Sequence, residues 1–134
     1  MTRTTHKRLS EERGQAMVEF AVVLPILVML LLAIWQFGVV FYNYISITDA
    51  ARVGARAAAV NRTNNPCAAA TSAIQNTVSP AQWSVVSSRI TCTPGTPGAV
   101  GTPYTIKITY PFQINVFVAR PASTMTATAT ERLE

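Results

Sequence analysis

The fold is decided by residues 14–60, which read GQAMVEFAVVLPILVMLLLAIWQFGVVFYNYISITDAARVGARAAAV. No charged side chain occurs between Glu19 and Asp49. This uncharged run exceeds the roughly 20 helical residues that cross a bilayer core. It also exceeds the apolar core of a removable secretory signal, which has about 7–15 residues. The stretch therefore predicts a signal anchor, a single membrane-spanning helix that the chain keeps.

The helical pattern continues past the predicted span. Residues 45–60 are rich in alanine and contain no proline, and the pattern breaks at residues 61–66, NRTNNP. One helix from about Gln15 to about Asn61 would be roughly 70 Å long. Because a bilayer core takes up only about 30 Å, the rest of the helix is expected to project from the membrane as a stalk.

Helical spacing gives the stalk two different faces. Asp49, Arg52 and Arg56 share a narrow polar face. Nearly opposite lies a face of mostly small residues, which comprises Ile47, Ala51, Gly54 and Ala58. Small side chains would let another helix or a sheet approach closely, whereas alanine could also simply fill an exposed helix. The pattern leaves both interpretations open.

The sequence after Pro66 predicts a short helix and three strands, at residues 67–79, 83–92, 104–112 and 123–131. The middle strand has the clearest signal, because apolar and polar side chains alternate along it. A Pro/Gly-rich connection at residues 93–103 favours an antiparallel hairpin of the first two strands. The predicted fold is α+β and membrane-anchored, with a long transmembrane and stalk helix followed by a small antiparallel sheet of about three strands.

The region beyond the stalk, about 70 residues long, is near the lower limit for an independent core. Cys67 and Cys92 would support it if they are bridged in an oxidising compartment. Closing a loop of about 26 residues is worth roughly 3 kcal/mol in the chain-entropy estimate. Two lone cysteines also fit unpaired thiols, so the sequence leaves the pairing open.

Charge indicates the topology and narrows the function. The cationic tail before the span favours a cytoplasmic N-terminus, although Arg52, Arg56 and Arg62 after the span make the bias modest. The net charge is +5, but no basic cluster is interleaved with aromatic residues, so a nucleic-acid partner is not expected. No small-molecule substrate is evident either.

Residue types needed for catalysis or metal binding are scarce. After Asp49 the acidic residues are Glu131 and Glu134, both at the C-terminus, and histidine does not occur there. An enzyme needs converging acid, base or nucleophile groups, so catalysis is not expected. The chain contains no CxxC, and its histidine, His6, lies in the N-terminal tail. No metal and no cofactor are expected.

Glu19 is the residue that composition does not explain. Deep in a bilayer an ionisable group costs roughly 2.5–3.5 kcal/mol on insertion scales, and less near the interface. Glu19 could reach the headgroups with its flexible side chain, or it could have a specific partner. Its surroundings favour a partner, because Gly14 ends a charged tail, Glu19 stands five residues later, and the apolar run that follows is broken by Pro25.

This arrangement resembles the class III signal of type IV pilin-like proteins, and residues 14 to 60 look like the TadE-like family of the tight-adherence (Tad) pilus system. The resemblance implies a pilin-like protein of the bacterial inner membrane with a small extracytoplasmic domain, which assists assembly of an adhesive pilus. It implies three kinds of partner: a prepilin peptidase, other pilin-like subunits and the Tad secretion machinery. Gly14 would precede the scissile bond, Gln15 would become the N-terminus, and Glu19 would be the glutamate at position five.

The resemblance gives three segments: a cytoplasmic leader at 1–14, a transmembrane and stalk helix at 15–61, and a small extracytoplasmic α/β domain at 62–134. After cleavage, the Gln15 amine could pair with Glu19 of the same chain or of a neighbour. Pro25 lacks an N–H, so it is expected either to kink the helix or to be tolerated without a task. A pilin-like assembly component is the preferred hypothesis, ahead of an uncleaved anchor that presents a binding domain, with a membrane enzyme third.

Overall fold

The computed structural model describes residues 4–61, 65–94, 98–113 and 122–134, with side chains described from Gly14 onward. Parts of both predicted connections, residues 62–64 and 95–97, lie outside the described residues, and so do the side chains of the predicted leader up to Arg13. Contacts divide the chain into two units, which we call the N-terminal unit (Met1–Gly38) and the C-terminal unit (Val39–Glu134).

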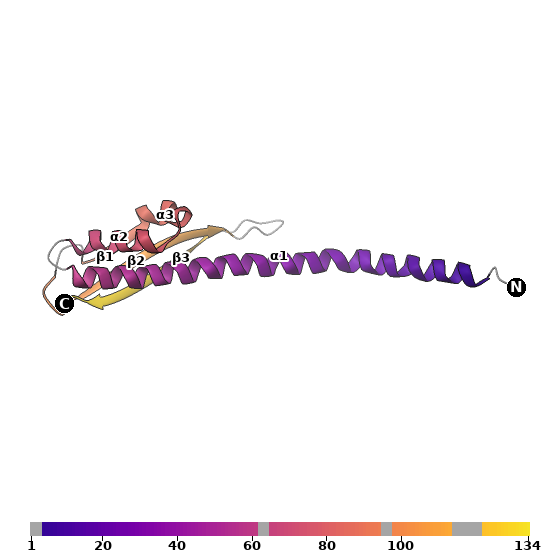
Figure 1. Ribbon diagram of the computed structural model, residues 1–134, viewed down its shortest axis with the longest axis horizontal. Coiled ribbons are helices and arrows are strands. Elements are labelled where there is room, and N and C mark those ends of the chain that lie inside the picture. The colour runs from indigo at the N-terminus through magenta and orange to yellow at the C-terminus, as the bar shows by residue number, and fades with distance from the viewer. Residues whose placement is uncertain (1–3, 62–64, 95–97, 114–121) are drawn as a thin grey trace. The chain divides into compact units, whose positions relative to one another are not determined.

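Apart from one additional short helix and a 3-10 turn, the elements follow the predicted order of a long helix, a short helix and three strands (Figure 1). They are α1 (Thr4–Val60), α2 (Pro66–Thr77), α3 (Pro80–Val86), a single 3-10 turn (Ser87–Arg89), β1 (Ile90–Thr93), β2 (Pro103–Gln113) and β3 (Ala122–Arg132). The helix α1 begins earlier than the predicted start near Gln15, and it continues through Pro25. At its other end, the Asn61 backbone N–H and side-chain amide both donate to the Ala57 carbonyl oxygen, at 3.2 and 3.0 Å.

Two short helices follow, each with a side-chain cap. The Asn65 Oδ1 atom accepts a hydrogen bond from the Ala68 N–H at 3.1 Å, and Pro66 opens α2. The helix α3 was not expected, and the strand predicted for residues 83–92 is wrong over residues 83–89. Ser79 and Gln82 form a capping box with Pro80 at the first helical position, so this segment starts a helix before the strand β1 begins at Ile90.

The three strands form one antiparallel sheet in the order β1, β2, β3. The short strand β1 pairs with the middle of β2, and β3 pairs with β2 along its whole length, from Pro103 opposite Arg132 to Gln113 opposite Ala122. The predicted alternation along β2 is confirmed, because Tyr104, Ile106 and Ile108 are buried while Lys107 is exposed. The α+β class with a long N-terminal helix and a three-stranded antiparallel sheet is therefore confirmed.

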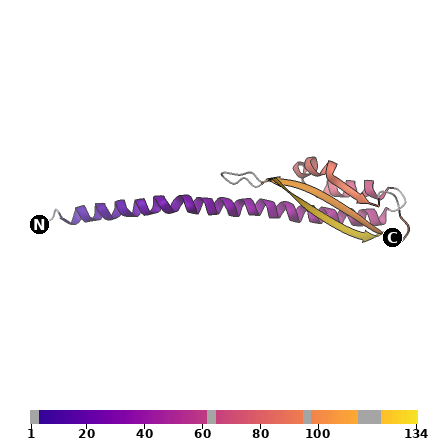
Figure 2. The ribbon, with the colours of Figure 1, turned by 180° about the vertical axis from the view of Figure 1, so that it is seen from behind.

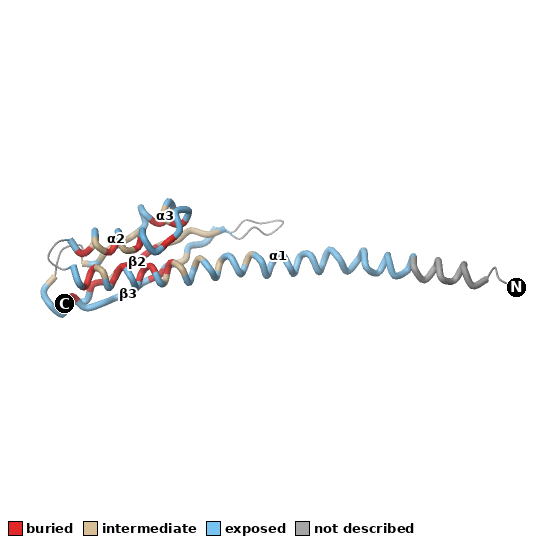
Figure 3. The backbone as a smooth tube through the Cα atoms, viewed as in Figure 1, coloured by how far each residue is buried: buried red, intermediate tan, exposed pale blue. Residues whose placement is uncertain are grey.

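A hydrophobic core lies inside the C-terminal unit, between one face of the sheet and the helices (Figure 3). The last turns of α1 contribute Ile47 and small residues to it, and α2 contributes Ala70 and Ile74. The small face of the stalk is thus packed and does not merely fill an exposed helix. The buried hydrophobic residues that form this core are Ile47, Ala50, Ala51, Ala55, Ala58, Ala70, Ile74, Val78, Val86, Tyr104, Ile106, Ile108, Ala127 and Leu133.

Candidate functional site

The start of the apolar segment brings together two of the residues singled out in the sequence. Gln15 Nε2 donates a hydrogen bond to Glu19 Oε1 at 3.3 Å, one helical turn away. Glu19 is the one charged residue between Gly14 and Thr48. Space around the Gly14 Cα is open, since a Cβ added there would meet nothing within 4 Å. The Glu19 carboxylate therefore faces residue 15 along the helix, beside an unobstructed glycine.

The apolar side chains that follow are exposed to the surroundings. The helix from Gly14 to Val60 is long and apolar enough to cross a membrane, with a mean hydropathy of 2.8 in its most apolar window and none of that window buried. Trp35, for example, is 73% exposed and Phe20 62%. Contiguous exposed apolar surface of this extent marks an interaction site, and a lipid phase would satisfy it.

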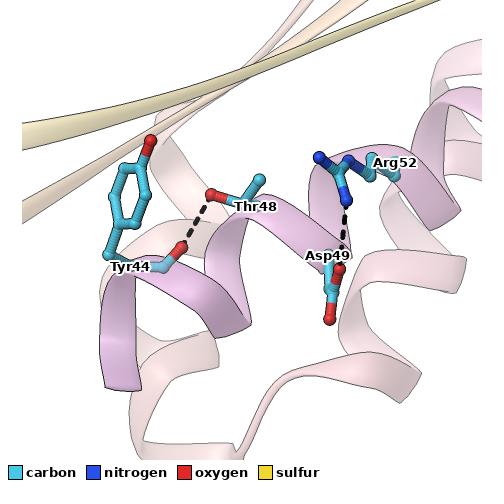
Figure 4. A network of polar contacts seen from close by, with 4 residues as sticks. All are labelled: Tyr44, Thr48, Asp49 and Arg52. Atoms are coloured by element: carbon cyan, nitrogen blue, oxygen red, sulfur yellow. Dashed lines mark hydrogen bonds and ion pairs between the residues drawn. The ribbon is translucent and has the colours of Figure 1, made fainter. Parts of the chain in front are cut away.

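The polar face of the stalk is exposed and contains one ion pair (Figure 4). Arg52 Nη1 lies 3.7 Å from Asp49 Oδ1, and both side chains are largely exposed, so the pair adds little stability. One turn earlier, the Thr48 hydroxyl donates to the Tyr44 carbonyl oxygen at 2.7 Å. Arg56 is also exposed.

Among the stalk residues singled out in the sequence, Gly54 lies at a packed contact with α2. A Cβ at this position would approach Ile74 Cδ1 and Cγ1 to 2.8 Å, and the Ala70 carbonyl oxygen to 3.4 Å. The helix α2 therefore contacts the backbone of α1 closely because residue 54 has no side chain. Asp49, Arg52 and Arg56 stay on the opposite, solvent-facing side.

A polar contact that was not anticipated holds α3 to α1. Gln82 is buried, donates from Nε2 to Asn43 Oδ1 at 2.8 Å, and accepts at Oε1 from the Ser46 hydroxyl at 3.0 Å. The same Oε1 accepts from the Ser79 N–H at 3.2 Å. The sequence Ser79-Pro80-Ala81-Gln82 is a pattern typical of a helix N-cap and could have indicated α3. No sequence pattern indicates that Gln82 binds Asn43 and Ser46 of α1.

Two further features support the C-terminal unit. Cys67 at the start of α2 and Cys92 in β1 form a disulfide with a Cα–Cα separation of 5.9 Å, which joins the helical layer to the edge of the sheet. Tyr104 of β2 is fully buried, and its hydroxyl oxygen has no hydrogen-bond partner among the described residues. Burial raises the pKa of the Tyr104 phenol.

Comparison with protein families gives a match for the apolar segment of α1 and the stalk that follows it. The model of the family described as "TadE-like protein" matches residues 14–56, which confirms the resemblance inferred from the sequence. The matched region comprises the membrane-competent part of α1 and most of the stalk. Comparisons with curated proteins and with solved structures give no match. Within the part of the chain that the structure describes, no three His, Cys, Asp or Glu side chains are grouped as metal ligands would be.

Proposed function

We propose that this chain is a pilin-like, non-enzymatic component of a Tad-type pilus, and that it assists assembly of the pilus for surface adhesion or secretion. In this proposal α1 spans the bacterial cytoplasmic membrane once, with the N-terminus in the cytoplasm and the C-terminal unit outside. The observation that carries it is the TadE-like match over residues 14–56, together with the Gly14, Gln15 and Glu19 arrangement at the start of that match.

The contact between residue 15 and Glu19 supports a role after cleavage. If a prepilin peptidase removes residues 1–14, the Gln15 nitrogen becomes a cationic amine one turn from the Glu19 carboxylate. The side chains of these two residues already lie 3.3 Å apart. In the low-dielectric boundary of a membrane, an amine of the same or a neighbouring subunit would offset the desolvation of Glu19. Such pairing fixes the axial register between subunits.

In such a subunit the two units would have different roles. The N-terminal unit exposes its apolar side chains, as a segment surrounded by lipid or by other apolar helices must. The C-terminal unit has a core of its own, which includes the small face of the stalk. Subunit contacts can therefore change around the N-terminal unit while the C-terminal unit stays folded.

The experiment that tests the proposal is N-terminal sequencing, with intact mass, of protein extracted from membranes of cells that produce the prepilin peptidase. The wild type should begin at Gln15, and Gly14→Val should keep the full-length precursor, because glycine lets the peptidase approach the backbone before the scissile bond. Gly38→Val is the matched control, since Gly14 and Gly38 both have open space around the Cα, and it should be processed as the wild type is.

Retention of residues 1–14 in the wild type would contradict processing. The uncleaved anchor that presents an extracytoplasmic binding domain would then replace the pilin-like component as the proposed function.

A further inference from the structure

The uncharged part of α1 is longer than the hydrocarbon core of a membrane. Phe20 to Thr48 spans about 44 Å at 1.5 Å per residue, which matches the roughly 40–45 Å of a bilayer with its headgroups. With Glu19 at one headgroup layer, the other layer falls on the first turns of the C-terminal unit, Val39–Ile45. Several apolar side chains there are exposed, including Phe41 (64%), Tyr42 (66%) and Ile45 (56%). Tyrosine and tryptophan favour this layer, and the neighbouring residues include Trp35 and Tyr44.

The end of the β2–β3 hairpin at which Gln113 pairs with Ala122 lies at the same end of the C-terminal unit. The other end of the hairpin is fixed to the end of α1, because the Glu134 N–H donates to the Ala59 carbonyl oxygen at 3.3 Å. An 11-residue strand such as β3 is about 36 Å long, and Val39–Val60 of α1 is about 33 Å long. The end of β2 and the start of β3 therefore lie level with the first turns of the unit, as both ribbon views show (Figures 1 and 2).

The described residues at this end carry few charges. Residues 39–48 of α1, all of α3, residues 108–113 of β2 and residues 122–125 of β3 contain no charged side chain. Among the described residues, one charged side chain lies near this end: Arg89 directly precedes Ile90, the partner of Ile108, and its guanidinium donates to the Val85 carbonyl oxygen at 2.7 Å. The other charged side chains of the described C-terminal unit lie farther along, from Asp49 on α1 and Lys107 on β2 to Glu131, Arg132 and Glu134 at the opposite end. An end with few charges and several aromatic residues, which continues along one helix into an apolar segment, fits a lipid surface, and an exposed arginine beside it can reach the headgroups.

We infer that this end of the C-terminal unit rests in the outer headgroup layer of the membrane, an inference that depends on the membrane span proposed above. We define the lipid-facing end as Val39–Ile45 of α1, Tyr110–Gln113 of β2 and Ala122–Met125 of β3. Lipid contact holds the C-terminal unit against the membrane before assembly. Extraction of the subunit into a pilus then has to break these contacts in addition to removing α1 from the bilayer.

Single-tryptophan variants of the full chain test the inference in vesicles of phosphatidylcholine brominated next to the headgroup, which quenches nearby indoles. All variants carry Trp83→Phe. The first keeps Trp35, the second carries Trp35→Phe with Phe112→Trp, and the third carries Trp35→Phe with Val100→Trp. Val100 is the matched control, because it is an exposed apolar residue beside Gly101, whose N–H donates to the Leu133 carbonyl oxygen at the opposite end of the unit.

We expect the Trp35 and Phe112→Trp proteins to lose most of their fluorescence relative to unbrominated vesicles, and the Val100→Trp protein to keep it. Fluorescence that stays unquenched in the Phe112→Trp protein, while Trp35 is quenched, would overturn the lipid contact and leave the span intact. An unquenched Trp35 would instead remove the span of the proposed function. Gln113→Trp repeats the measurement at an exposed position in case Phe112→Trp disturbs folding. Protection of the indole from bromine quenching that grows with the protein-to-lipid ratio would overturn the lipid contact and assign this end to a second copy of the chain.

Discussion

The two units treat apolar side chains in opposite ways, although one helix runs through both. In the N-terminal unit, large residues such as Phe20 and Trp35 are exposed. In the C-terminal unit, the part of α1 after Ile45 buries one face made of Ile47 and small residues. Large exposed apolar residues indicate the medium that surrounds a helix, whereas small buried ones indicate a neighbour that packs against it. Side-chain size therefore separates the two environments better than hydropathy does.

The largest expected effect is the loss of the disulfide, which belongs to the C-terminal unit alone. Cys67→Ser with Cys92→Ser should lower the free energy of unfolding of this unit by about 3 kcal/mol, the entropy of closing a loop of this length. Urea unfolding of detergent-solubilised protein, followed by Trp83 fluorescence, measures the change. The N-terminal unit has no part in the bridge, so the double variant should resist carbonate extraction from membranes as the wild type does.

Thiol labelling gives an independent check of the same bridge. In protein that has passed through the membrane, denaturing and non-reducing conditions should leave Cys67 and Cys92 unmodified. Labelling of both would show that the cysteines stay reduced, which would contradict the bridge and with it the oxidising location of the C-terminal unit.

Gly54 and Gly38 lie on the same helix but in different units, so equal substitutions compare the two units. The expected loss of stability is smaller than that from the disulfide. Gly54→Leu places a side chain where Ile74 Cδ1 and Cγ1 would be 2.8 Å from the new Cβ, so overpacking should cost the C-terminal unit about 1–3 kcal/mol. A Cβ added at Gly38 meets nothing within 4 Å, so Gly38→Leu should leave that stability unchanged. The same urea titration compares the two proteins, and equal destabilisation would mean that the position along α1 does not decide the cost.

A third change acts inside the core. Tyr104→Phe removes a buried hydroxyl that has no partner among the described residues, so its effect near neutral pH should be within about 1 kcal/mol and on the stabilising side. The variant should also change how the free energy of unfolding depends on pH under alkaline conditions. Because burial raises the pKa of Tyr104 in the folded state, the wild type loses stability as the pH rises above the unfolded value near 10. The Phe variant should lack that loss, as unfolding curves across this pH range would show.

Much of this fold was predictable because its signals are local. The apolar run, the alternation along β2, and the Asn-rich break after α1 each depend on nearest neighbours in the sequence. Capping explains the error at residues 83–89, since β-branched Val85 and Val86 favour a strand while the Ser79 and Gln82 capping box starts a helix just before them. At these residues the capping box outweighs the strand propensity of the two valines.

The tertiary partners could not be predicted in the same way. The spacing of the stalk indicates that its small face can pack, but it does not indicate that Ile74 of α2 lies over Gly54 or that Gln82 of α3 reaches Asn43. Those contacts depend on how α2 and α3 fold back, which no periodicity encodes. The hydrogen bond between the Gln15 and Glu19 side chains spans a single helical turn, whereas the pairing of Glu19 with a Gln15 amine after cleavage stays a prediction.

The smallest expected effect on the C-terminal unit comes from Glu19→Ala, and here the comparison of the two units is tested most directly. Glu19 lies in the N-terminal unit and its described hydrogen bond is to Gln15, so the substitution should leave the disulfide and the protease resistance of the C-terminal unit unchanged. It should ease membrane insertion, because an ionisable group is removed. Under the proposed cleavage, the substitution removes the partner of the Gln15 amine, and assembly should therefore suffer selectively.

Crosslinking between neighbouring pilin-like subunits, together with surface piliation at matched membrane levels, measures that loss. Glu19→Gln is the matched control for charge, since it keeps the length and the hydrogen-bonding oxygen of the side chain but cannot pair electrostatically with an amine. If the pairing is ionic, Gln should behave like Ala, because a neutral amide offsets little of the desolvation of a buried amine. If Gln supports normal crosslinking, Glu19 acts through a hydrogen bond. Normal crosslinking and piliation in the Ala variant would return Glu19 to the residues that merely reach the headgroups, and the uncleaved anchor would then explain the chain better.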